Sequence, residues 1–152
     1  MRNAKQKPAA MPAVEDTHLD AGQEPRAWRE FSGGERAQMA KMVTRLFEHW
    51  ALDMPTQALL LGLSPDSRST VTRYRKGAPL PAARDLLDRV GNLFGIHKSL
   101  RLLYPHNREL AYAWPTARNR GLDNLSPLEV MLMHGLPGMV AVRGYLDWLR
   151  GR

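Results

Sequence analysis

The chain has no cysteine, no long apolar run and relatively few acidic residues. The lack of cysteine excludes disulfide bonds and cysteine-ligated metal sites, and it is compatible with a reducing cytoplasm. Hydrophobic residues make up 43% of the chain, yet no apolar stretch approaches the ~20 residues that cross a membrane. The basic start MRNAKQKPAA has no apolar segment behind it, so we expect no secretory signal. We therefore expect no membrane partner.

Basic side chains outnumber acidic ones by 22 to 15, which gives a formal charge of +7. Such a balance favours an acidic partner, and nucleic acid is the commonest one. A basic protein that is merely soluble is the alternative. With 152 residues, the chain is long enough for one domain or two very small ones, with a modest core.

The residue patterns of known catalytic sites are also missing. No two histidines stand at metal-ligand spacing. Gly33-Gly34 lacks the preceding strand and the following lysine of a phosphate-binding loop. Ser32, Ser64 and Ser126 are explained by helix caps and turns. Enzyme is therefore the weakest functional class, and we expect neither a cofactor nor a metal. The five histidines are His18, His49, His97, His106 and His134.

The N-terminal part divides into a leader and a first helix. Residues 1–27 contain few large apolar side chains, which predicts a disordered leader; an arm whose basic end touches DNA phosphate is the alternative. Order is expected from Trp28. Ser32 and Glu35 suit a capping box, and apolar side chains then recur at spacings of three and four. This predicts a helix over residues 33–50 whose buried face is Met39, Met42, Val43, Leu46, Phe47 and Trp50.

Residues 55–77 have the pattern of a helix-turn-helix. Pro55 can open a short helix that Gly62 ends, and a second helix over residues 67–76 is closed by Gly77. In the second helix, Val71 and Tyr74 are spaced to face inward. We therefore predict an N-terminal DNA-binding domain over residues 28–78.

The outward side of that second helix contains no acidic residue. Hydroxyl side chains near its start can approach phosphates or base edges, and arginine can bind guanine through two hydrogen bonds. Arg75 and Lys76 suit the phosphate backbone. Two alternatives are an ordinary solvated face and a helix-turn-helix that no longer binds DNA. The predicted DNA-binding residues are Arg68, Ser69, Thr70, Thr72, Arg73, Arg75 and Lys76.

A second domain is predicted over residues 79–152, after the stiff joint Ala78-Pro79-Leu80-Pro81. A helix starting near Pro81 is expected, with an interruption at Gly95. Its apolar stripe is either core or, in part, a homodimer seam. A short helical piece is expected over residues 110–114. The stripe consists of Ala83, Leu86, Leu87, Val90, Leu93 and Phe94.

The last part of the chain predicts two short helices. Ser126-Pro127-Leu128-Glu129 combines a cap, a proline suited to the first helical position and a capping-box glutamate. Gly135 is placed to end this helix in a left-handed conformation. After a predicted turn at Leu136-Pro137-Gly138, a second amphipathic helix carries Met139, Val142, Tyr145, Leu146 and Leu149.

These patterns resemble the Xre/ParS-type antitoxins of bacterial toxin–antitoxin pairs. Residues 57–74 are similar to an Xre/Cro-type helix-turn-helix, although extra residues lie between Ser64 and Thr70. The helix-turn-helix likeness rests on Gln57-Ala58, Gly62-Leu63-Ser64 and Thr70-Val71-Thr72-Arg73-Tyr74. The likeness to the C-terminal toxin-binding domain rests on Trp114, the Asn119 loop, Leu125-Ser126-Pro127-Leu128-Glu129, Gly135, Val140 and Leu146.

The resemblance implies an all-α protein of the bacterial cytoplasm that blocks the active site of a toxin, commonly a RES-domain protein acting on NAD. It also implies operator DNA as a partner and a homodimer as the binding species. An exposed Trp148 between arginines is typical of an interface anchor; covering its own core is the alternative. Rival interpretations are a free-standing transcription regulator and a structural adaptor. The predicted toxin-binding residues are Asn119, Tyr145, Trp148, Arg150 and Arg152.

Overall fold

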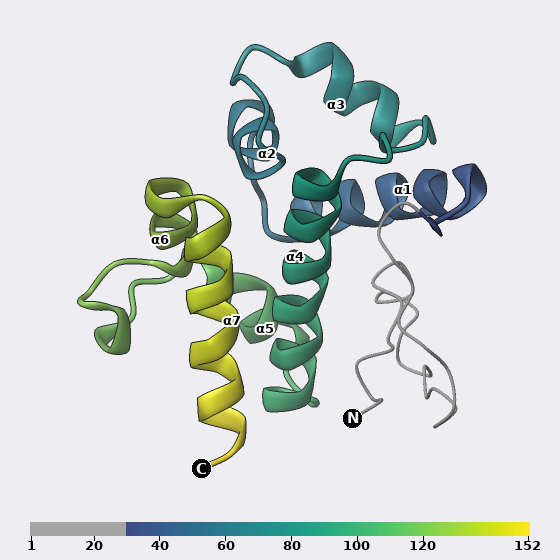
Figure 1. The fold of residues 1–152 in the computed structure, drawn as a ribbon. Helices are drawn as coiled ribbons and strands as arrows, with labels where there is room; N and C mark the ends of the chain where they lie inside the picture. Colours follow the sequence, from purple (N-terminus) through teal and green to yellow (C-terminus); the bar gives the residue numbers. More distant parts are fainter. Residues whose placement is uncertain (1–29) are drawn as a thin grey trace, which may run out of the picture.

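The computed structural model describes residues 30–152, whose named elements are seven α-helices and two short 3-10 helices (Figure 1). Within this part of the chain no strand is present, and the one β-type contact is an isolated bridge between Asn119 and Leu125. The predicted all-α fold is confirmed. The predicted leader, residues 1–27, lies outside the described residues. The elements are α1 (Gly33–His49), α2 (Met54–Leu60), α3 (Arg68–Arg75), α4 (Arg84–Leu103), α5 (Arg108–Ala113), η5 (Trp114–Thr116), η6 (Arg120–Leu122), α6 (Pro127–His134) and α7 (Leu136–Arg150).

Helix α1 has the predicted cap and the predicted buried face. The Ser32 hydroxyl accepts a hydrogen bond from the Glu35 amide at 3.0 Å, and the Glu35 carboxylate accepts one from the Ser32 amide at 2.9 Å. These two bonds satisfy donors that a helix start leaves free. On the inner face, Val43 and Phe47 are fully buried, and Trp50 just after the helix is buried as well.

Helices α2 and α3 form the predicted helix-turn-helix. The Asp53 carboxylate caps α2 by accepting a hydrogen bond from the Thr56 amide at 3.0 Å. Gly62, shortly after α2, has a φ of 79°, a conformation that glycine adopts without steric cost. Val71 and Tyr74 of α3 are buried, as their spacing predicts. Helix α3 thereby packs on both α1 and α2.

Helix α4 runs unbroken for 20 residues. The predicted interruption at Gly95 is wrong, because this glycine lies buried inside the helix. The Arg143 side chain of α7 occupies the space that a Cβ of Gly95 would need. A helix interior tolerates one glycine at a cost of about 1 kcal/mol, and here the glycine lets the Arg143 side chain of α7 lie against α4.

The apolar stripe of α4 is core from Leu86 onward, whereas Ala83 precedes the helix and is exposed, which contradicts its predicted place in the stripe. Because the side chains of this core are buried within the chain, they are not available as a seam between two copies, which decides between the two interpretations of this stripe. Helix α4 contacts α1 on one side and α7 on another (Figure 1). Its buried apolar side chains are Leu86, Leu87, Val90, Leu93, Phe94, Ile96 and Leu100.

The connection between the last two helices is shorter than the sequence predicts. The capping box of Ser126 and Glu129 at the start of α6 is confirmed. Gly135 ends α6 with a positive φ of 65°, but its ψ of −138° differs from the left-handed helical value. Helix α7 begins at the next residue, so the predicted turn at 136–138 is wrong. Gly138 lies inside α7, where a Cβ would collide with the Val130 carbonyl of α6.

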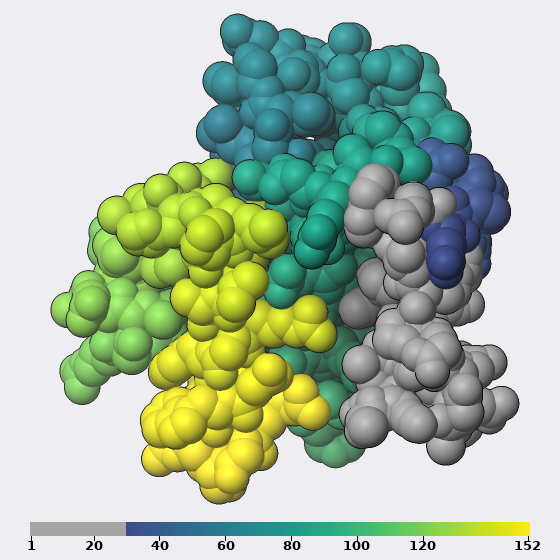
Figure 2. All heavy atoms as spheres, in the orientation of Figure 1, coloured from purple at the N-terminus to yellow at the C-terminus, as the bar shows by residue number. Residues whose placement is uncertain are grey.

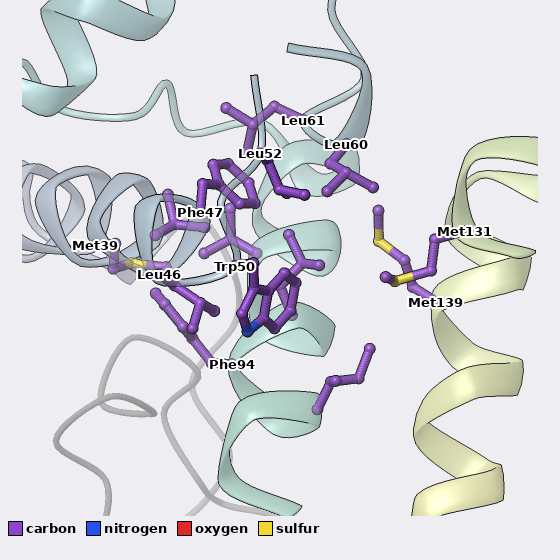
Figure 3. Close-up of a cluster of buried hydrophobic side chains, with 14 of the residues drawn as sticks. Met39, Leu46, Phe47, Trp50, Leu52, Leu60, Leu61, Phe94, Met131 and Met139 are labelled. Atoms are coloured by element: carbon purple, nitrogen blue, oxygen red, sulfur yellow. The ribbon is translucent and has the colours of Figure 1, made fainter. Parts of the chain in front are cut away.

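A single hydrophobic core joins both halves of the described chain. Figure 3 shows Trp50 next to α4, with Met131 and Met139 approaching from α6 and α7. All three side chains are essentially fully buried. Burial of this kind is the main favourable contribution to folding, so the helix-turn-helix and the C-terminal helices stabilise one another through α4.

Candidate functional site

Two surfaces carry the predicted site residues, and they lie at different ends of the molecule. In the fold of residues 30–152, helix α3 lies at one end and the C-terminus of α7 lies at the opposite end (Figure 1). The two surfaces therefore do not overlap.

Helix α3 presents a basic and hydroxyl-bearing surface. Arg68, Ser69, Arg73 and Lys76 are exposed. Residues 67–77 contain no acidic side chain, so nothing within α3 neutralises these charges. Such a helix can place donors against phosphates and base edges in a DNA groove.

The two threonines of α3 are less accessible than the arginines. Thr70 and Thr72 are partly buried. The Arg73 guanidinium donates a hydrogen bond to the Thr70 hydroxyl at 3.4 Å, which lays this side chain along the helix. The structure therefore brings most of the predicted DNA-binding residues onto one face. Among the exposed residues, Arg73 lies nearest the middle of the segment.

Arg75 differs from its expected outward position. Its Nε lies 3.0 Å from a carboxylate oxygen of Glu48 on α1, without hydrogen-bonding alignment. Its terminal nitrogen donates to the Gln57 side-chain oxygen of α2 at 3.4 Å, and the side chain is 36% exposed. Arg75 therefore ties α3 to α1 and α2, and a free phosphate contact would compete with Glu48 for it.

The C-terminal surface is built around a row of aromatic rings. The ring centroids of Trp114 and Tyr145 are 6.5 Å apart, and those of Tyr145 and Trp148 are 5.8 Å apart. The guanidinium carbon of Arg152 lies 4.8 Å from the Trp148 ring centroid, within range of a cation–π contact. The row runs from a buried indole at Trp114 to Trp148, which is 57% exposed.

Asn119 and Tyr145 form one hydrogen-bonded unit at the base of this row. The Asn119 side-chain oxygen accepts from the Gly121 amide at 2.8 Å and from the Tyr145 hydroxyl at 3.4 Å. Gly121 has no Cβ, which leaves room for the Tyr145 ring. These contacts hold the loop of residues 119–125 against α7 and orient Tyr145.

Arg150 is held by the chain itself. Its guanidinium donates to the Ser99 hydroxyl of α4 at 3.2 Å and lies 3.4 Å from an Asp147 carboxylate oxygen. Ser99 is buried and was not among the predicted site residues. The sequence signal for this contact residue is that Ser99 is the single serine within the apolar pattern of α4. The structure thus separates a tethered Arg150 from Arg152, which packs on Trp148.

Both surfaces carry side chains that are suited to binding a partner. Within residues 30–152 no group of three or more histidine, aspartate or glutamate side chains is arranged to hold a metal ion. The groups at both surfaces are guanidinium, hydroxyl, amide and aromatic side chains. Such groups bind phosphates, bases and protein surfaces.

A helix-turn-helix joined to a small helical domain with an exposed aromatic end defines a DNA-binding protein with a second binding domain. A model of the antitoxin Xre-like helix-turn-helix domain matches residues 35–95. A model of the antitoxin Xre/MbcA/ParS C-terminal toxin-binding domain matches residues 99–152. The chain belongs to this family of antitoxins, and it is a toxin-neutralising, DNA-binding protein. The comparison with curated proteins gave no match.

In residues 30–152, no helix is both long enough and apolar enough to cross a bilayer.

Proposed function

We propose that the chain neutralises a RES-type toxin, which acts on NAD, by placing its C-terminal residues in the active site of the toxin. The observation that carries this proposal is the exposed Trp148 with Arg152 packed on it, at the end of the toxin-binding domain. Tryptophan and arginine are the side chains most often found as interface anchors. The RES identity of the toxin rests on the resemblance to the family.

Arg152 suits a contact with the anionic pyrophosphate of NAD held by such a toxin. A guanidinium offers several donors in a planar fork, which matches phosphate oxygens. Arg150 is less free, because Ser99 and Asp147 already bind it. We assign Arg150 to orienting the end of the chain, and Arg152 with Trp148 to entering the toxin.

Removing the residues after Leu149 tests this assignment. The truncated chain keeps Met139, Val142 and Leu146, which anchor α7 in the core, so its fold should be unchanged. We expect it to rescue cells poorly from the toxin encoded by the neighbouring gene, when both are expressed together at graded levels. Circular dichroism and gel filtration check the fold.

The control for charge is the double variant Arg45→Ala and Arg108→Ala. It removes the same two positive charges at exposed positions far from the C-terminus in sequence. We expect this variant to neutralise as well as the natural chain. Full neutralisation by the truncated chain would contradict the proposed role of the last residues.

We propose further that the chain represses its own operon as a homodimer. The exposed Arg68, Ser69, Arg73 and Lys76 of α3 favour this activity. A dimer would place two α3 helices on half-sites about 34 Å apart, one helical turn of DNA. The rival proposal is a free-standing regulator whose C-terminal domain only dimerises; it predicts repression without any toxin binding.

Arg73→Ala tests the DNA-binding role of α3. We expect operator affinity to fall by about 1–3 kcal/mol, the worth of one bidentate base contact, with toxin neutralisation unchanged. Footprinting and gel-shift titrations of the operon's own promoter measure this. Arg45→Ala on α1 is the matched control.

If Arg73→Ala and Lys76→Ala both left promoter binding unchanged, α3 would not be the recognition helix. That result would favour the structural-adaptor interpretation. Lys76→Ala should otherwise weaken binding to all sequences alike and lower the salt slope by about 1, as loss of a single phosphate contact does.

A further inference from the structure

Helix α7 has an exposed and mostly uncharged side opposite its core side. Met139, Val142 and Leu146 are fully buried on the core side. Side chains spaced three and four residues apart lie on the same side of a helix. The exposed residues with this spacing, called the outward face here, are Pro137, Val140, Ala141, Gly144, Asp147 and Trp148, and the Asp147 carboxylate is paired with Arg150.

Gly144, in the middle of this face, is not needed by the chain's own packing. A Cβ added at Gly144 would have no heavy atom of residues 30–152 within 4 Å. By contrast, a Cβ at Gly95 or Gly138 would collide with a neighbouring helix. Glycine disfavours a helix interior, so an exposed glycine on α7 needs another explanation. A partner whose backbone approaches closely provides one, because glycine allows such an approach.

The apolar surface continues beyond α7 onto α6. Val140 is 53% exposed, Met133 is 63% exposed and Leu132 is 39% exposed. A single residue, Gly135, separates α6 from α7. Figure 2 shows the two helices as adjoining parts of one face. Large exposed apolar side chains on adjoining helices favour an interaction surface.

We propose that the outward face of α7 binds a helix of the toxin, which crosses α7 at Gly144. This rests on the proposed function. The occupant is assigned to the toxin because the face lies within the segment that matches the toxin-binding domain. The face also includes Trp148, so the proposed contact reaches the residues at the end of α7. Val140, Ala141 and Gly144 would hold the toxin in place while the last residues reach its active site.

Two substitutions at Gly144, made in the full chain, test this. Gly144→Leu puts a bulky side chain where the toxin helix would lie, and Gly144→Ala adds a single methyl group. Overfilling a packed contact weakens it by an amount that corresponds to about ten- to hundredfold in Kd. We expect this loss for Gly144→Leu and a smaller one for Gly144→Ala. The probe is an inactive variant of the toxin encoded by the neighbouring gene.

The same substitutions should raise the melting temperature of the free antitoxin, because alanine and leucine favour helices over glycine. A loss of toxin affinity is then not a loss of fold. Gly33→Leu is the matched control. It lies at the exposed start of α1, where an added Cβ would meet only the flexible Arg36 side chain within 4 Å among the described residues. We expect no change in toxin affinity from this variant.

The inference is overturned if Gly144→Leu binds the toxin as tightly as the natural chain. It is also overturned if Gly144→Leu separates an antitoxin dimer in gel filtration while toxin affinity stays the same, because the face would then bind a second copy. Failure of the natural chain to bind the toxin would overturn the proposed function as well. The chain truncated after Leu149 distinguishes the two contacts: it should still bind the toxin weakly, and Gly144→Leu should remove that residual binding.

Discussion

At the scale of single residues, the least expected feature is a stack of three rings that joins α1, α4 and α5. The Tyr112 ring lies parallel to the His49 ring at 4.4 Å and to the His97 ring at 6.0 Å. The three rings come from distant parts of the chain. Burial, together with the positive charge of Arg101 and the nearby His49, lowers the pKa of His97 to about 4.

This depressed pKa predicts that the chain loses stability in mild acid. In the unfolded chain His97 has an ordinary pKa near 6.5, so the unfolded state takes up a proton first. Stability from this group is fully present above about pH 6.5, falls as the pH drops towards 4, and is constant below that. The loss is about 2–3 kcal/mol over this range. Urea unfolding at several pH values measures it.

His97→Phe is the control, because phenylalanine keeps a ring beside Tyr112 and cannot take up a proton. We expect the unfolding free energy of this variant to vary less between pH 6.5 and 4. An equal pH dependence in both proteins would show that other groups cause the loss.

At the scale of helices, the start of a helix can be recognised from the local sequence, whereas the role of a glycine inside a helix cannot. Ser32 and Ser126 each form the capping box that the sequence predicts, because a cap involves only residues three apart. Gly95, Gly138 and Gly144 look alike in the sequence, as glycines within apolar patterns. The first two lie against another helix, whereas Gly144 faces open space among the described residues. Their roles follow from what packs beside them.

Arg75 shows the same limit for charged side chains. On α3 alone its spacing indicates an outward position, like that of Arg73. Glu48 lies on α1, 27 residues earlier in the chain, and only the packing of α1 on α3 brings its carboxylate to Arg75. Helical spacing describes the faces of one helix, and the partner of a side chain depends on the neighbouring helix.

At the scale of the whole molecule, α4 connects the two segments that match the family models. The first match ends at residue 95 and the second begins at residue 99, and both positions lie inside α4. The Arg89 side chain of α4 lies close to Gly62 of the helix-turn-helix and to Gly135 between α6 and α7. The predicted domain border at residues 78 and 79 stays a prediction.

We expect the described chain to unfold in one transition, because a single core joins both segments. Helical ellipticity and tryptophan fluorescence should give the same urea midpoint. Met139→Ala in α7 should lower this midpoint for both probes, since removing a fully buried methionine side chain costs about 2–5 kcal/mol. Two separate transitions, or a change seen by one probe only, would mean that the segments fold independently.

The sequence by itself determined the helical class, most helix boundaries and the helix-turn-helix, whereas it left the exposure of Trp148 open. These features depend on neighbours within about one helical turn, where spacing and capping residues act directly. The tertiary structure alone decided that α4 is unbroken at Gly95, that Arg75 pairs with Glu48 and that Arg150 is tied to Ser99. Each of these contacts joins residues far apart in the chain, and such contacts exist only once the helices have packed on the common core.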